Sequence, residues 1–276
     1  MKLVLIHGIN NVGTPVADRL ASWRRALIRG GTAADRIDAA MPVMPDYARL
    51  LRDGQVRDPL GPSVPADQAK LAFMAQCMGT MLRHWNNDLG ASLAAIDPAT
   101  DTLHAARLYG QMLGGATPPR FGDIVEIIDE IYDYLTKPAL RSQIDAIVAA
   151  ALTGEQLIVV GHSLGAVVGW RLLHSMGASG IDLGTVHFAT LGAPFPIPAL
   201  RAVLDAPFQW PATLGSWINL YHPLDYVSLG SSFRLAAGGP QPKHHRIVTD
   251  ERDPHDHRGY LAAAPLRNWL DRLLVP

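Results

Sequence analysis

The stretch Gln156-Leu-Ile-Val-Val-Gly-His-Ser-Leu-Gly-Ala-Val-Val-Gly-Trp170 decides how the rest of the chain is interpreted. Its first part, Leu157 to Val160, is a short apolar run rich in β-branched residues, which is typical of a buried strand. The segment from Leu164 to Met176 has helical spacing and stops at Gly177. Ser163 is therefore predicted to lie in a tight turn between a strand and a helix.

The residues Gly161-His-Ser-Leu-Gly165 have the spacing of a nucleophile elbow. A nucleophile at the apex of such a turn has a strained backbone, and side chains two residues to either side would collide with the strand or the helix. Gly161 and Gly165 remove that crowding. Ser163 would also lie beside the first N–H groups of the following helix, which can stabilise a developing oxyanion. The pattern predicts that Ser163 is a nucleophile.

Composition favours one large domain with a sizeable core, because 48% of the 276 residues are hydrophobic and 18% are charged. The net charge of −1 gives no electrostatic reason to expect nucleic acid or an anionic membrane as a partner. Cys77 is the single cysteine, so an internal disulfide is excluded, and its apolar surroundings favour an inert thiol. No apolar run is long enough for a membrane span, and the run at the N-terminus is too short for a signal peptide. We therefore expect a cytoplasmic protein.

Further apolar runs alternate with segments of helical spacing. We expect strands at 3–6, 36–41, 185–190, 216–220 and 246–249, and helices at 15–29, 66–93, 102–113, 123–134, 138–152 and 261–274. Thr14 is the expected N-cap of the first helix, with Pro15 at its first position. This alternation predicts the α/β class, with a mostly parallel sheet flanked by helices on both faces.

The mostly helical segment 50–119 interrupts this alternation. We interpret it as a helical cap inserted over the active edge of the sheet, within a single domain that spans 1–276. Its Met and aromatic side chains are expected to pack in the core rather than form a substrate wall; they are Phe73, Met74, Met78, Met81 and Trp85.

A serine hydroxyl needs a base within hydrogen-bond reach and an acid that orients the base. Asp225 directly follows the strand expected at 216–220, and catalytic groups belong at the carboxyl ends of such strands. Asp182 and Asp205 are weaker candidates, because neither follows a strand. Asp225 is therefore the predicted acid.

Two histidines are candidates for the base, because both lie after the last expected strand and before the last helix. We prefer His257, with His255 as the alternative. His244 and His245 lie at or before the start of that strand, which is the wrong end. Tyr260 follows closely and could pack against the ring of the base.

The loop after the first strand, His7-Gly8-Ile9-Asn10, is expected to supply the second oxyanion donor. Gly8 lets the backbone approach closely, and the N–H of Ile9 would join that of Leu164. His7 itself is expected to be a structural residue that bonds the loop. The role of Asn10 remains open between a turn residue and a polar contact.

These motifs, together with Thr190-Leu-Gly-Ala-Pro194 and the ending His257-x-x-Tyr260, resemble the α/β-hydrolase superfamily, and within it the bacterial lipase-like serine esterases. The resemblance covers roughly the first 50 residues and everything from about Asp123 onward. It implies hydrolysis of carboxylic esters through an acyl-serine intermediate, with no metal and no organic cofactor. The apolar cap favours acyl or alkyl esters over highly charged substrates, so a small-molecule or lipid ester is the expected partner.

Three alternatives remain at this point. The same triad could cleave a thioester or an amide, because the acyl-enzyme chemistry is shared. The fold could serve as an interaction module without catalysis. A metallohydrolase could use the polar cluster of the late loop, made of His244, His245, His255, Asp256 and His257.

Overall fold

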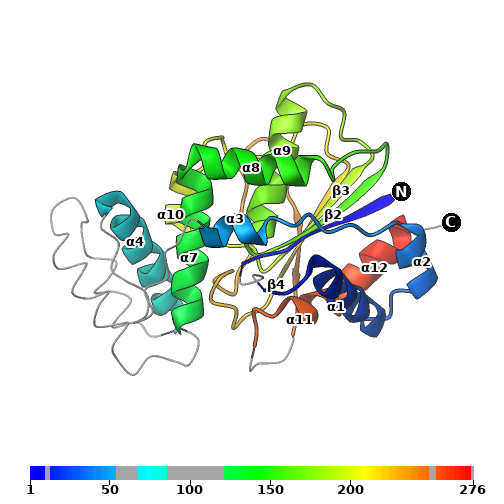
Figure 1. Ribbon diagram of the computed structural model, residues 1–276, viewed down its shortest axis with the longest axis horizontal. Helices are drawn as coiled ribbons and strands as arrows, with labels where there is room; N and C mark the ends of the chain where they lie inside the picture. The colour runs from blue at the N-terminus through cyan, green and yellow to red at the C-terminus, as the bar shows by residue number, and fades with distance from the viewer. Residues whose placement is uncertain (10–12, 54–66, 86–120, 249–252, 275–276) are drawn as a thin grey trace.

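The five strands in the described part of the chain form one sheet in which all neighbouring strands are parallel. The computed structural model describes residues 1–9, 13–53, 67–85, 121–248 and 253–274 (Figure 1). The strands lie side by side in chain order, as β1 (Lys2–Ile6), β2 (Leu157–His162), β3 (Val186–Leu191), β4 (Ser216–Tyr221) and β5 (Lys243–Arg246). The protein therefore has the α/β architecture that the alternating segments predict.

The chain changes direction across the sheet at β1. Val4 pairs with Val159 of β2 on one edge and forms an isolated parallel bridge with Val43 on the other. The chain thus moves first to one side of β1 and later returns to form β2 on the opposite side. In open parallel sheets, ligands bind outside the carboxyl ends of the strands at such a switch point. Here this place lies between the loop after β1 and the turn after β2.

Helices cover both faces of the sheet (Figure 1). One layer contains α1 (Val16–Arg29), α2 (Ala34–Ala39), α11 (His257–Leu261) and α12 (Ala264–Leu273). The other contains α3 (Ala48–Asp53), α7 (Phe121–Thr136), α8 (Pro138–Ala149), α9 (Leu164–Ala178) and α10 (Pro198–Ala202). Ile158 and Val160 of β2 point into the first layer, whereas Leu157 and Val159 point into the second. A strand covered on both faces needs consecutive apolar residues, which explains the unbroken run in β2.

Helix α4 (Gln68–Trp85) packs against α7 and α10 rather than on the sheet, and Figure 1 shows it on the side of α7 away from the strands. The rings of Phe73 and Tyr132 lie 5.1 Å apart between α4 and α7. Lys70 of α4 reaches the carboxylates of Asp129 and Asp133 of α7 at 2.5 and 2.8 Å. Apolar contacts and ion pairs therefore join these two helices.

The predicted cap is described in part. The structure does not describe residues 54–66 and 86–119 of this segment. The helix expected at 102–113 and the side chain of Trp85 therefore lie outside the described residues. The other four Met and aromatic residues of the segment are buried in the core cluster, as expected; they are Phe73, Met74, Met78 and Met81. Burial also raises the pKa of the Cys77 thiol, which keeps it protonated and inert.

Three local predictions are wrong. The segment expected as a strand at 36–41 is the helix α2, because Ala and Arg favour helix and Ile37 is its one buried side chain. The last strand is β5 rather than 246–249; as an edge strand it is partly exposed and needs no apolar sequence. Pro15, not Thr14, is the N-cap of α1. The other strands and most of the expected helices are confirmed, with α11 and α12 together replacing the single helix expected at 261–274. Within the described ranges, no helix has the length and apolar composition that a bilayer crossing requires.

Candidate active site

The turn between β2 and α9 holds Ser163 in a strained conformation. Its φ is 54° and its ψ is −124°, in the left-handed half of φ that residues with a side chain rarely adopt. A Cβ atom on Gly161 would come within 2.6 Å of the carbonyl oxygen of Gly165. A Cβ atom on Gly165 would overlap the carbonyl oxygen of Ile6. Both glycines are therefore required for the close packing of β1, β2 and α9 around the serine.

Ser163, His255 and Asp225 form a hydrogen-bonded chain although they are distant in the sequence. His255 Nε2 lies 3.1 Å from Ser163 Oγ, and His255 Nδ1 lies 3.0 Å from both carboxylate oxygens of Asp225. A carboxylate only accepts hydrogen bonds, so Nδ1 carries the proton and Nε2 is left to accept from the serine hydroxyl. At most 9% of each of these three residues is exposed to solvent. The arrangement can move a proton from Ser163 to His255.

Asp225 is held by donors on several sides. The N–H of Val227 donates to its Oδ1 at 2.9 Å, and the hydroxyl of Tyr260 donates to its Oδ2 at 2.5 Å. The same hydroxyl accepts from the N–H of His222 at 3.0 Å. Burial, followed by the charge of Asp225, raises the pKa of Tyr260 well above its usual value, so its hydroxyl stays protonated and donates. The predicted acid therefore has a fixed orientation toward His255.

His257, the preferred candidate for the base, does not lie beside Ser163 in the structure, and the alternative His255 takes that position. His257 begins α11, and its ring stacks on Trp23 of α1 with 5.5 Å between centroids. Its Nδ1 lies 3.3 Å from Asp256, and burial lowers its pKa to about 4. Asp256 is the N-cap of α11 and accepts a hydrogen bond from the N–H of Arg258. Because the helix begins here, His257 points toward α1, whereas His255, just before the cap, points toward the serine.

The loop after β1 approaches the nucleophile closely. A Cβ atom on Gly8 would come within 2.9 Å of Ser163 Cβ, so the sequence-predicted glycine is required at this contact. Ile9 follows, partly buried against the core, and Leu164 is fully buried at the first position of α9, where its N–H has no acceptor within the helix. The oxyanion role of these two N–H groups stays a prediction. Asn10 lies outside the described residues.

His7 has the structural role expected from the sequence. Its ring is fully buried and stacks on Tyr47 at 4.2 Å, and its Nδ1 donates to the carbonyl of Gly8 at 2.7 Å. The Tyr47 hydroxyl donates to the carbonyl of His7. Burial lowers the pKa of His7 to about 4, so the ring is neutral near pH 7. These bonds fix the loop that carries Gly8.

Sequence reasoning did not anticipate two contacts at this site. Tyr260 was named as a residue that could pack against the ring of the base, but its hydroxyl contacts Asp225, the predicted acid. Sequence reasoning gave no role to His162, whose Nε2 lies 2.9 Å from the carbonyl oxygen of His255. The available signal was chemical: a buried tyrosine or histidine needs a hydrogen-bond partner.

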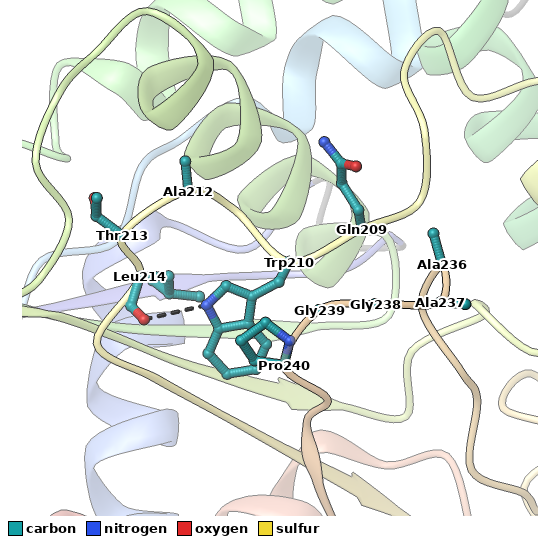
Figure 2. Close-up of a pocket in the computed structure, with 10 residues that line it drawn as sticks. All are labelled: Gln209, Trp210, Ala212, Thr213, Leu214, Ala236, Ala237, Gly238, Gly239 and Pro240. Atoms are coloured by element: carbon teal, nitrogen blue, oxygen red, sulfur yellow. Dashed lines mark hydrogen bonds between the residues drawn. The ribbon is translucent and has the colours of Figure 1, made fainter.

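A pocket of about 540 Å³ lies near the amino ends of the strands, whereas Ser163 lies at their carboxyl ends (Figure 2). Its walls include 212–214, just before β4, and 236–240, just before β5, so it adjoins the amino ends of these strands. Trp210 forms another wall, and its indole N–H donates to the carbonyl of Leu214 at 3.2 Å. The pocket is therefore separate from Ser163, which follows the carboxyl end of β2.

Comparison with known proteins adds no relative: no family model and no curated protein matches the chain. Any assignment of function rests on the geometry of the site. Among the described residues, no three His, Cys, Asp or Glu side chains are grouped so as to hold a metal ion. The histidines of the late loop separate instead, with His244 and His245 in β5 and His255 beside Ser163.

Proposed function

We propose that this protein is a serine hydrolase that cleaves carboxylic esters through an acyl-serine intermediate. The observation that carries the proposal is the chain of hydrogen bonds from Ser163 through His255 to Asp225, with the serine at a strained turn. A strained backbone at a residue with a side chain costs about 1–3 kcal/mol, and such residues cluster at active sites. A nucleophile, a base and an orienting acid are the groups that acyl transfer needs.

We also propose that the fold is that of the α/β-hydrolases. The nucleophile follows β2, the acid follows β4 and the base follows β5, so the chain order is Ser, Asp, His, as in that fold. All neighbouring strands are parallel, and the site lies at their carboxyl ends. The segment 50–119 would then be a helical cap, consistent with α4, which packs on α7 and α10 instead of the sheet.

The proposed reaction has two halves that use the same groups. Ser163 Oγ attacks the ester carbonyl carbon, its proton passes to His255 Nε2, and the carbonyl electron pair moves onto oxygen. The N–H groups of Ile9 and Leu164 stabilise this oxyanion. The intermediate collapses, the C–O bond to the alcohol breaks, and the alcohol takes the proton from His255. A water molecule then attacks the acyl-serine in the same way, which releases the acid and restores Ser163.

The proposed substrate is an acyl or alkyl ester, from a small molecule or a lipid, and the proposed location is the cytoplasm. A net charge of −1 provides no electrostatic attraction for nucleic acid. No metal or organic cofactor takes part in the proposed steps.

The decisive experiment is hydrolysis of a short p-nitrophenyl ester by the wild-type protein and the Ser163→Ala variant. Because the hydroxyl forms the covalent bond, we expect kcat to fall by at least about 10⁴-fold, with unchanged thermal unfolding. Equal rates in the two proteins would refute the proposal. Parallel assays with a thioester and an anilide of the same acyl group would identify the preferred acyl bond, since the triad can act on all three.

A further inference from the structure

His162 precedes the nucleophile directly and is almost completely buried, with 7% of the residue exposed. Its Nε2 lies 2.9 Å from the carbonyl oxygen of His255, and because a carbonyl only accepts, Nε2 must carry the hydrogen. Burial, followed by the nearby imidazoles of His255 and His257, keeps the pKa of His162 well below its usual value. The ring is therefore a neutral donor near pH 7.

The main chain around His255 has little other support from regular structure. His255 belongs to the short segment 253–256, which contains no helix or strand and precedes α11. A backbone bond closes this segment as a turn, from the N–H of Asp256 to the carbonyl of Asp253 at 3.1 Å. His162 instead connects it to the end of β2, an inner strand that pairs with β1 on one side and β3 on the other.

The ring of His162 is itself held in place. It lies edge-on to Trp23 at 6.4 Å between centroids, and it packs at 5.9 Å from Tyr260 and 4.8 Å from the ring of His255. These neighbours come from α1, α11 and the loop that carries the base. A donor whose ring cannot turn can fix the position of its acceptor.

We propose that His162 is a positioning residue for the base: its Nε2–H holds the main chain of His255 so that the imidazole reaches Ser163 and Asp225 together. This inference rests on the proposed hydrolase function. The residue before the nucleophile thereby couples the two halves of the site, because the same strand end sets the position of the serine and of the base. Displacement of a catalytic group by about 1 Å can lower a rate by about 100-fold.

Three substitutions separate the donor from the bulk of the ring. Gln has its amide N–H₂ at about the distance from the backbone of the imidazole Nε2, whereas Asn has it only as far out as Nδ1. Phe keeps an aromatic ring and removes the donor. His162→Gln is therefore the conservative variant, and His162→Asn and His162→Phe remove the bond in different ways.

The experiment measures kcat and KM for ester hydrolysis by the three variants, with His187→Asn as the matched control. His187 bonds to Ser216 near the amino end of the sheet, away from the site. We expect the Asn and Phe variants to lose about 100-fold in kcat with little change in KM, whereas the Gln variant and the control keep a rate within a few-fold of wild type. Wild-type kcat in the Asn and Phe variants, or a Gln variant as slow as the Phe variant, would overturn the inference.

A second measurement needs no substitution and no activity. Nitrogen NMR of the histidine rings in the wild-type protein should show His162 neutral and protonated on Nε2 at pH 7, and protonation on Nδ1 alone would overturn the inference. Thermal unfolding of each variant identifies any that fails to fold. If a variant fails to fold, the NMR measurement on the wild-type protein still tests the hydrogen bond from His162 to His255. If the wild-type protein neither cleaves an ester nor reacts with a fluorophosphonate, the proposed function fails, while the NMR result still tests the bond to His255.

Discussion

Replacing Tyr260 by Phe removes one hydroxyl from the centre of the site without removing any group that contacts the serine. The hydroxyl donates to Asp225 Oδ2 at 2.5 Å and accepts from the N–H of His222 at 3.0 Å. Both Tyr260 and Asp225 are fully buried, so water cannot take its place. The substitution leaves the acid with one fewer donor and leaves a buried N–H without this acceptor.

The structure gives the direction and scale of two effects. A hydrogen bond to a charged group stabilises a fold by about 1.5–3 kcal/mol, and a buried donor left unpaired costs about 1–3 kcal/mol. At about 2–4 °C per kcal/mol for a chain of this size, Tm should fall by about 10 °C. The carboxylate of Asp225 also loses one of the donors that orient it toward His255. Its hydrogen bond to the imidazole is then less well positioned, so kcat should fall by about 10-fold with little change in KM.

The assay measures kcat and KM for hydrolysis of a short p-nitrophenyl ester, together with thermal unfolding. Tyr134→Phe is the matched control, because Tyr134 is also fully buried and its hydroxyl donates to a carboxylate, that of Asp145, at 2.8 Å. That pair joins α7 and α8, and its hydrogen bond is separate from the hydrogen-bonded chain of Ser163, His255 and Asp225. The control should lose stability and keep the wild-type kcat.

A wild-type kcat in Tyr260→Phe would contradict this prediction. An equal loss of kcat in Tyr134→Phe would also contradict it, because a general loss of stability would then explain the slower reaction.

Two further predictions concern packing and pH. In Gly165→Ala, the new Cβ atom would overlap the carbonyl of Ile6. Because backbone atoms cannot move away without cost, the free energy of unfolding should fall by about 1–3 kcal/mol or more. The control is Gly239→Ala, where a Cβ atom meets nothing within 4 Å, and equal Tm values for the two variants would contradict the prediction. His7 has its pKa lowered to about 4 in the folded protein, so the unfolded chain binds the proton first, and His7 alone should lower the free energy of unfolding, measured with urea, by up to about 3 kcal/mol as the pH drops from about 6.5 to 4. His162 and His257, whose pKa values burial also lowers, add to the total fall. His7→Asn, which keeps a donor near Nδ1, should reduce this slope, and an unchanged slope would show that His7 does not cause it.

The local sequence was sufficient to predict the turn around Ser163, because strand, glycines and helix lie within fifteen residues and their constraints are local. Asp225 was also predictable, since a residue that directly follows a buried strand must lie at the carboxyl edge of the sheet. The sequence could not show which of His255 and His257 lies beside Ser163, because both follow the last expected strand. Helix α11 begins after the Asp256 cap, between the two histidines, so their side chains point in different directions.

Other errors have related physical causes. The strand expected at 36–41 failed because a short segment in which Ile37 is buried and Met41 is exposed fits a helix as well as a strand. The last strand was misplaced because an edge strand with polar residues on both faces, such as Lys243–Arg246, has no apolar pattern to find. The contacts of Tyr260 and His162 depend on tertiary packing, which spacing along the chain does not reveal.

The most direct test of the account is to label the protein with a fluorophosphonate and locate the modification by mass spectrometry, in the wild-type protein and in the His255→Gln and His257→Gln variants. The account predicts that wild type and His257→Gln are modified at Ser163 at similar rates. His255→Gln should react slower by about 10³-fold or more, because of these two histidines only His255 lies within hydrogen-bond distance of the serine hydroxyl. Modification of another residue, or fast labelling of Ser163 in His255→Gln, would contradict it.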